Sequence, residues 1–213
     1  MNLWNYYDGD LKYPDLNKHS HEKEIAKTNS KWAFEYVSKH EKDEDLEPAI
    51  AKSIKGSYYY AKYILNAQPF PLGEKIIAKS AEYSYLYAAE VLKKSFKLGE
   101  KAIATNAQYS YLYAKHVLNE QPFKLGEKAI ATSAEYSYMY ARDVLKGAFK
   151  LGEKAIATDY HYACYYAIYV IKASFELGEP AIAKDALHSL RYTDIILKKD
   201  FYLDGKLIYK YEG

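Results

Sequence analysis

The stretch FKLGEKAIATNAQYSYLYAKHVL, residues 96–118, decides the fold, because the chain repeats it almost unchanged as FKLGEKAIATSAEYSYMYARDVL, residues 123–145. A Leu-Gly-Glu triplet recurs with its glutamate at positions 74, 100, 127, 153 and 179, at spacings of 26, 27, 26 and 26 residues. An earlier copy has Glu47 another 27 residues upstream, and residues 24–40 form a degenerate leading copy. Such a period indicates a stacked repeat protein.

Each copy contains two predicted helix starts. When the copies are aligned, one position, or column, of the repeat holds only residues whose side-chain oxygen can cap a helix N-terminus: Ser53, Ser80, Asn106, Ser133, Asp159 and Asp185. The other start follows the repeat glutamate, where Pro48 and Pro180 suit a first helical turn and the glutamate charge favours the positive end of the helix dipole. We therefore expect a short helix of about two turns, a cap and a longer helix of about three to four turns.

The longer helix has one packing face. At 100° per residue, Ser84, Tyr87, Ala88, Val91 and Leu92 fall on one stripe. Equivalent tyrosines, and a phenylalanine in each connector, recur in every clear copy: Tyr60, Tyr87, Tyr113, Tyr140, Tyr166 and Tyr192, with Phe70, Phe96, Phe123, Phe149, Phe175 and Phe201. A unit of this size cannot bury two amphipathic helices alone, so neighbouring copies must share their faces.

The sequence thus predicts an all-α fold, an α-solenoid of about six to seven 26-residue helix-turn-helix repeats similar to HEAT-like solenoids. We expect residues 1–44 to form an N-terminal capping segment with the degenerate repeat, residues 45–202 the solenoid, and residues 203–213 a C-terminal cap.

The composition of the chain excludes several classes of protein. The 213 residues are 49% hydrophobic and include 26 tyrosines, and the single cysteine, Cys164, excludes an internal disulfide framework. No run approaches the roughly 18 apolar residues of a membrane span, and the start of the sequence lacks a signal-peptide pattern. The expectation is an intracellular protein without membrane insertion.

The net charge is distributed unevenly along the chain. Residues 1–47 carry a net charge of −4, and residues 48–213 carry a net charge of +6. This positive charge permits nucleic-acid contact without requiring it.

Two columns point away from the packing stripe and vary between copies. Apolar residues facing outward in register would form an exposed patch of the kind that marks binding surfaces. The alternative is that these residues pack against the shorter helices. The residues predicted to bind a partner are Tyr59, Leu86, Leu112, Met139, Tyr165, His116 and Tyr169.

Lysines also recur in the central copies and give an alternative function, nucleic-acid binding. Stacked lysines beside tyrosines suit phosphate contacts and base stacking. One set directly follows the repeat glutamates, so internal pairing on a solvated face is the competing interpretation. The two sets are Lys75, Lys101, Lys128 and Lys154, and Lys97, Lys124 and Lys150.

A second alternative is a small-ligand or enzymatic pocket where the repeat is broken, at residues 159–164. There the usual SAEYSY has become DYHYAC, which introduces Tyr160, His161, Tyr162 and Cys164. Cys164 replaces a tyrosine and suits a small core filler. His19 and His21 have a spacing that can hold a metal, but without a third ligand nearby they indicate no metal site.

The motifs YSYLYAKHVL and FKLGEKAIAT together resemble short α-helical repeats of bacteriophage and large-virus proteins, in which a Tyr-x-Tyr-Ala helix is followed by a Phe-x-x-Gly-Glu connector. The resemblance covers about residues 45–202, and the first copy departs from it with Asp45-Leu46-Glu47. It implies a viral origin and an all-helical fold, but no general activity.

These features favour a non-enzymatic scaffold that binds a macromolecule. One glutamate per copy, repeated along a rod, does not converge with other groups as catalysis requires. We expect a protein partner, a host protein if the chain is viral, whose process the chain would then antagonise in the host cytoplasm. No cofactor is expected.

Overall fold

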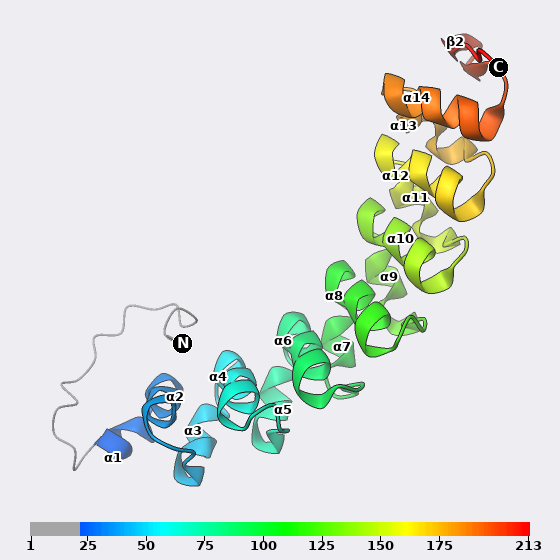
Figure 1. Ribbon diagram of the computed structural model, residues 1–213. Coiled ribbons are helices and arrows are strands. Elements are labelled where there is room, and N and C mark those ends of the chain that lie inside the picture. Colours follow the sequence, from blue (N-terminus) through cyan, green and yellow to red (C-terminus); the bar gives the residue numbers. More distant parts are fainter. Residues whose placement is uncertain (1–21) are drawn as a thin grey trace. The chain divides into compact units, whose positions relative to one another are not determined.

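The structure, a computed structural model, describes residues 22–213, and these are mostly helical (Figure 1). Short and longer α-helices alternate: α1 Glu22–Ala26, α2 Ser30–Lys39, α3 Glu47–Ile50, α4 Ile54–Tyr59, α5 Pro71–Ile77, α6 Ala81–Leu86, α7 Glu100–Ile103, α8 Ala107–Leu112, α9 Glu127–Ile130, α10 Ala134–Tyr140, α11 Glu153–Ile156, α12 Tyr160–Tyr165, α13 Glu179–Ile182 and α14 Ala186–Tyr192. The described residues form two compact units, 22–103 and 104–213, so the division falls between α7 and α8.

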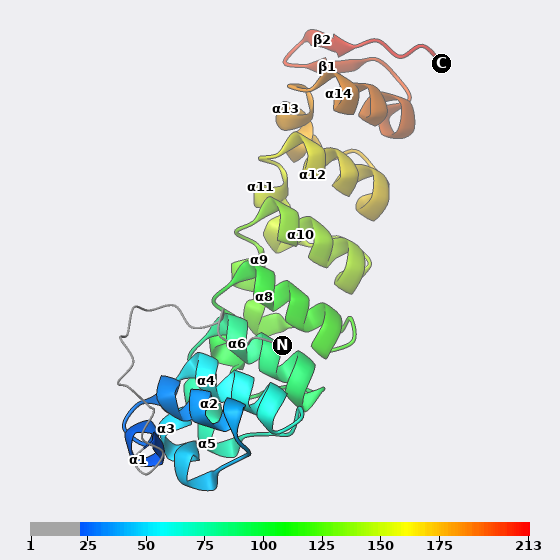
Figure 2. The ribbon, with the colours of Figure 1, turned by 60° about the vertical axis from the view of Figure 1, so that its left-hand side comes forward.

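Within each unit, successive longer helices contact one another. In the first unit α4 contacts α2 and α6, and in the second α10 contacts α8 and α12, while α12 contacts α14 (Figures 1 and 2). The predicted all-α solenoid of repeated helix pairs is confirmed. The degenerate leading copy is also a helix pair, α1 and α2, and Asn29 caps α2. His19 and His21 lie outside the described residues.

The predicted caps explain where the longer helices begin. All six residues of the cap column have extended backbone, and their side chains accept backbone N–H groups from the first turn. Pro48 and Pro180 lie in the first turns of α3 and α13, as expected.

Each of these longer helices then changes its hydrogen-bonding pattern, which the sequence analysis did not predict. The second half is π-helical, with i→i+5 bonds such as Leu65 N–H to the Tyr60 carbonyl. The segments are Tyr60–Ile64, Tyr87–Leu92, Tyr113–Val117, Ala141–Leu145, Tyr166–Ile171 and Thr193–Leu197. Since π-helix is rare and has no propensity signature, sequence periodicity missed it. The packing stripe survives, because Ser84, Tyr87, Ala88 and Val91 are buried.

The repeated tyrosines and phenylalanines form the core. In all six pairs the tyrosine is fully buried, and its ring lies edge-on to the phenylalanine of its own connector, with ring centroids 4.9–5.5 Å apart. Tyr166 shows the polar role: its hydroxyl accepts the Phe149 N–H at 3.0 Å and donates to Glu153 at 2.9 Å. We call this arrangement the tyrosine relay. It recurs at Tyr87, Tyr140 and Tyr192.

The repeat glycines allow the helix pairs to approach closely. A Cβ at Gly152 would come within 2.5 Å of the Phe149 ring and of Oγ of Ser137, a residue of the preceding longer helix. The same steric conflict arises at Gly73, Gly99, Gly126 and Gly178. Ser137 in turn donates to the Ile130 carbonyl at 2.9 Å. Only glycine fits this position, which explains why the triplet keeps it.

A β-hairpin follows the last helix pair. Strands β1, Phe201–Leu203, and β2, Lys206–Tyr209, pair antiparallel, and β2 contacts α14. Asp204 and Gly205 have φ of +51° and +77°, the geometry of a tight hairpin turn. FYLDGK stands where other copies have FKLGEK, and this change replaces a helical turn with a hairpin. Strand β1 therefore begins inside the range 45–202 that was expected to form the solenoid.

Among residues 22–213, no helix has the length and apolar character needed to cross a membrane.

Candidate functional site

The longer helices α10 and α12, with the π-helical segments that follow them, enclose a surface groove of about 510 Å³ in the unit Ala104–Gly213. We call it the aromatic groove. Its lining residues are Tyr138, Met139, Arg142, His161, Tyr162, Tyr165 and Tyr169. The groove is of the size and apolar character of small-molecule and side-chain pockets.

Tyr138 is the buried residue of the groove. Its ring centroid lies 5.9 Å from that of Tyr162 and 6.4 Å from that of Tyr165, so one helix pair contacts the next through aromatic rings. Aromatic pairs at these separations are attractive beyond their buried area. The rings of the groove therefore hold one another in position without a ligand.

Arg142 supplies the positive charge of the groove. Its guanidinium carbon lies 5.1 Å from the Tyr138 ring centroid, a cation–π contact. It also donates two hydrogen bonds to Asp143, at 2.5 and 3.0 Å. The Asp143 carboxylate therefore holds the guanidinium over the ring and offsets part of its charge.

Asp143 connects this helix pair to the preceding one. It accepts from the Tyr111 hydroxyl at 2.6 Å and from the Lys115 ammonium at 2.7 Å, and both donors belong to the previous longer helix and its π-helical segment. Burial alone would raise the pKa of Asp143, but the hydrogen bonds from Arg142, Lys115 and Tyr111 outweigh it and lower that pKa. The carboxylate stays ionised at neutral pH and serves structure rather than proton transfer.

The exposed side of the groove is a cluster of rings on α12. The Tyr165 ring centroid lies 4.2 Å from that of His161 and 5.4 Å from that of Tyr169. The Tyr165 hydroxyl accepts a hydrogen bond from Arg191 at 3.0 Å, which ties it to α14. Tyr169 is 56% exposed. Its ring is therefore available to a partner.

His188 lies behind this cluster, with its ring centroid 5.4 Å from that of His161. Nδ1 is 2.6 Å from the Asp185 carboxylate, while the buried Nε2 has no hydrogen-bond partner among the described residues. The interaction with His188 lowers the pKa of Asp185. His188 takes the repeat position held by Tyr162 one copy earlier, so here it acts mainly as a core ring.

The structure brings together only part of the predicted partner-binding set. Met139, Tyr165 and Tyr169 line the groove, whereas Leu112 and the exposed His116 do not. Tyr59 and Leu86 belong to the other unit, where both are half-buried. Tyr59 packs among neighbouring rings, with centroids 6.5 Å from Phe34 and 5.9 Å from Tyr63. Tyr59 thus contacts rings of a longer helix and of its own π-helical segment, rather than the shorter helices of the alternative interpretation.

Tyr138 and Arg142 line the groove but were not among the residues predicted from the sequence. In other copies, the residues at these two repeat positions have the character of packing or solvated residues. Their i, i+4 spacing brings a cation over a tyrosine on one helix face, and this signal was available in the sequence. The same spacing recurs at Tyr111 and Lys115, whose ammonium lies 5.5 Å from the ring centroid.

The lysine sets of the nucleic-acid alternative differ in their partners. Lys97, Lys124 and Lys150 each form an ion pair three residues along the chain, with Glu100, Glu127 and Glu153, at 2.9–3.0 Å. The competing interpretation argued for internal pairing from the lysines that directly follow the repeat glutamates, whereas the structure has the ion pairs on this other set. The other set is exposed and has no ion pair among the described residues: Lys75, Lys101, Lys128 and Lys154.

The alternative pocket at residues 159–164 merges with the aromatic groove, since His161 and Tyr162 line it. Tyr160 is exposed outside it, and Cys164 is fully buried. Burial raises the pKa of the Cys164 thiol to about 11, so the thiol is protonated at neutral pH and is a poor nucleophile. Among the described residues, no group of three or more His, Cys, Asp or Glu side chains could hold a metal.

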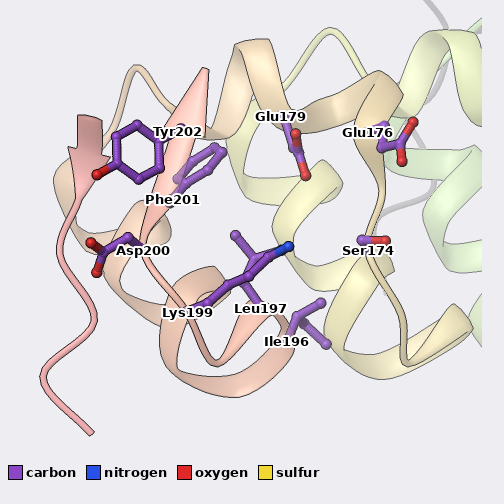
Figure 3. Close-up of a pocket in the computed structure, with 9 residues that line it drawn as sticks. All are labelled: Ser174, Glu176, Glu179, Ile196, Leu197, Lys199, Asp200, Phe201 and Tyr202. Carbon is purple, nitrogen blue, oxygen red and sulfur yellow. The ribbon is translucent and has the colours of Figure 1, made fainter. Parts of the chain in front are cut away.

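A second hollow of about 840 Å³ lies at the C-terminal end, and its lining side chains are shown in Figure 3. They come from the connector before α13, the end of the last π-helical segment and the start of the hairpin: Ser174, Glu176, Glu179, Ile196, Leu197, Lys199, Asp200, Phe201 and Tyr202. Glu179 is already hydrogen-bonded to Tyr192, and Asp200 accepts the Tyr211 N–H. The lining of this hollow is polar and mixed in charge, and two of its carboxylates already have partners, whereas the aromatic groove is lined mainly by rings and is the better candidate site.

No protein-family model, curated protein or solved structure matches this chain.

Proposed function

We propose that the chain is a non-enzymatic repeat scaffold that binds a protein partner through the aromatic groove. The observation that carries this proposal is the groove itself: five rings and a methionine meet at a surface where Tyr169 is 56% exposed. Tyrosine and arginine are the residues most enriched among interface hot spots, because they combine apolar area with a polar tip. The catalytic alternative lacks support, since Cys164 lies outside the groove and its thiol is protonated at neutral pH.

The division of the repeat into constant and variable positions also supports binding. The tyrosine relay, the glycine and the phenylalanine keep their identity in copy after copy, and these residues stack the helices. The groove is built from repeat positions whose residue changes between copies. Met139 and Tyr165 stand where two earlier copies have leucine. Tyr169 stands where earlier copies have Glu90 and His116. A constant stack with a variable face is how repeat proteins acquire specific partners.

The chemistry of the groove favours an apolar or aromatic side chain of the partner as the anchor. Arg142 is already ion-paired with Asp143, so an uncharged anchor leaves no cation of the groove without a partner. If the resemblance to viral repeats holds, the partner is a host protein and the chain antagonises a host process.

The test is capture of partners by the full chain and by a Tyr169→Ala variant. Tyr202→Ala, on the hairpin, is the matched control because Tyr202 is 53% exposed. Loss of a hot-spot tyrosine should reduce the captured partner by at least about tenfold, while the control captures as much as the unchanged chain. An empty capture at native salt, or equal capture by both variants, would contradict the proposal.

Nucleic-acid binding is a second candidate, supported by four exposed lysines that form no ion pair within residues 22–213: Lys75, Lys101, Lys128 and Lys154. A mobility-shift titration decides it, because phosphate contacts weaken steeply as salt rises. The expected result is a shift at low salt that the fourfold Lys→Gln variant loses. No shift at low salt would dismiss this candidate.

A further inference from the structure

One leucine in each of five copies remains exposed at the same repeat position. These are the leucines of the Leu-Gly-Glu triplets, and they are 52–57% exposed: Leu72, Leu98, Leu125, Leu151 and Leu177. A single exposed leucine is ordinary on a protein surface. Five at one repeat position form a regular apolar feature, which the sequence analysis did not single out.

The backbone explains why the leucines face outward. In the unit Ala104–Gly213 they lie in 3-10 turns, Lys124–Gly126, Lys150–Gly152 and Glu176–Gly178. The glycine of each turn is pressed against the preceding longer helix, where an added Cβ would come within 2.8 Å of Ser110, Ser137 or Ala163. The glycine therefore packs against the longer helix, and the adjacent leucine faces the solvent.

Each of two consecutive turns contacts the short helix of the preceding copy. The turn Lys150–Gly152 contacts α9, and the turn Glu176–Gly178 contacts α11. Leu125, Leu151 and Leu177 therefore form a row along the stack, which we call the leucine ladder. It shares no residue with the aromatic groove.

The charges around the ladder are mostly positive at the surface. Lys124, Lys128, Lys150 and Lys154 are exposed, and Glu176 is the exposed acid of the three turns. The ion-pair partners of Lys124 and Lys150, Glu127 and Glu153, are half-buried and also accept hydrogen bonds from the Tyr140 and Tyr166 hydroxyls. Their carboxylates are directed to the interior, so a partner meets ammonium groups beside the leucines.

We propose that the leucine ladder binds an amphipathic α-helix of another protein that has apolar residues seven positions apart and acidic residues beside them. Packed helices are about 8–10 Å apart, so the leucines should recur at about that distance. Seven residues of an α-helix rise about 10.5 Å, just above the upper end of this range. Same-face residues of a β-strand recur every 6.8 Å or so, which is further from it. The acidic flanks meet Lys128 and Lys154.

The probe is a synthetic helical peptide of about three heptads, with leucine at every seventh position and flanking glutamates. Its affinity is measured by fluorescence anisotropy against the full chain. The variant Leu125→Ser, Leu151→Ser, Leu177→Ser should bind at least about tenfold more weakly. The matched control is Leu187→Ser on α14, since Leu187 is 53% exposed and lies off the ladder, and it should bind as the unchanged chain does. Circular dichroism checks that both variants keep their helical content.

Two further peptides make the result specific. A peptide with the same leucines and flanking lysines should bind at least about tenfold more weakly at low salt, and so should one with leucines off the heptad spacing. Equal binding of all three peptides, or unchanged binding of the triple variant, would overturn the proposal. So would a stable homodimer, measured by light scattering, that the triple variant abolishes, because the occupant would then be a second copy of this chain.

Discussion

At the residue scale, the buried tyrosine hydroxyl is the group on which each helix pair depends. Tyr166 accepts from a backbone N–H of the preceding connector and donates to a glutamate of its own short helix. One side chain thus joins three segments that are separate in sequence. A phenylalanine would fill the same space and leave Phe149 N–H without its acceptor in a site that excludes water.

Replacing Tyr166 by phenylalanine should therefore lower the free energy of unfolding by about 1–3 kcal/mol, the usual cost of leaving a buried polar group unpaired. Urea unfolding followed by circular dichroism measures it. Tyr169→Phe is the control, because that side chain is exposed, and it should change stability by less than about 0.5 kcal/mol. Equal effects of the two substitutions would show that the relay does not stabilise the fold.

The same tyrosines predict how stability responds to alkaline pH. Burial, with hydrogen bonds to the glutamates, raises the pKa of Tyr60, Tyr140 and Tyr166. Burial also raises the pKa of Tyr87 and Tyr192. Because the folded pKa lies above the unfolded value of about 10, this contribution to stability is complete below pH 10 or so and is lost as the pH rises above it.

We therefore expect the urea midpoint to fall above about pH 10. Tyrosinate absorbance at 295 nm should show the buried tyrosines ionising together with the loss of helical circular dichroism. If all 26 tyrosines ionised while the helical signal stayed intact, the buried hydroxyls would not be as inaccessible as their packing implies.

At the element scale, the close approach of neighbouring helix pairs fixes the stack. Gly152→Ala should destabilise the protein by about 1–3 kcal/mol, because the added methyl group must displace the Phe149 ring or Ser137. Thermal or urea unfolding measures the change.

Gly147→Ala is the matched control for this prediction. The nearest atom to an added Cβ there is 3.8 Å away, an ordinary contact, so stability should change little. If Gly152→Ala were as stable as Gly147→Ala, glycine would not be a steric requirement of the stack.

Much of the secondary structure and of the helix packing could be predicted from the sequence. Capping residues are chosen locally, so Ser53 and Asp185 mark helix starts without knowledge of the fold. The period of 26–27 residues likewise predicts shared faces. The π-helical halves could not be predicted, since i→i+5 bonding has no residue signature. The hairpin could have been, because Asp204-Gly205 between apolar residues is a strong turn signal.

The groove was only partly predictable. Met139, Tyr165 and Tyr169 follow from periodicity, because they lie off the packing stripe. Tyr138 does not, because its column is buried in two other copies, at Tyr58 and Tyr111. What opens the groove is Tyr169, which stands where earlier copies have Glu90 and Asp143 as partners of the preceding tyrosine. The effect of having Tyr169 in place of an acidic residue depends on contacts between neighbouring longer helices, so it cannot be seen in the sequence.

At the scale of the whole molecule, each helix pair depends on its neighbours for stability. Repeats that share faces are stabilised mainly by the interfaces between them, so damage at one interface should reach the adjacent pairs. The proposed groove depends on this, because its rings come from two successive pairs.

The most direct test is hydrogen exchange, read by mass spectrometry, on the full chain and on its Gly152→Ala variant. The account predicts that amide protection falls in α11 and α12 and also in α9, α10, α13 and α14 on either side, while Gly147→Ala leaves all of them protected. Loss of protection confined to residues 146–171, with the adjacent pairs unchanged, would contradict it.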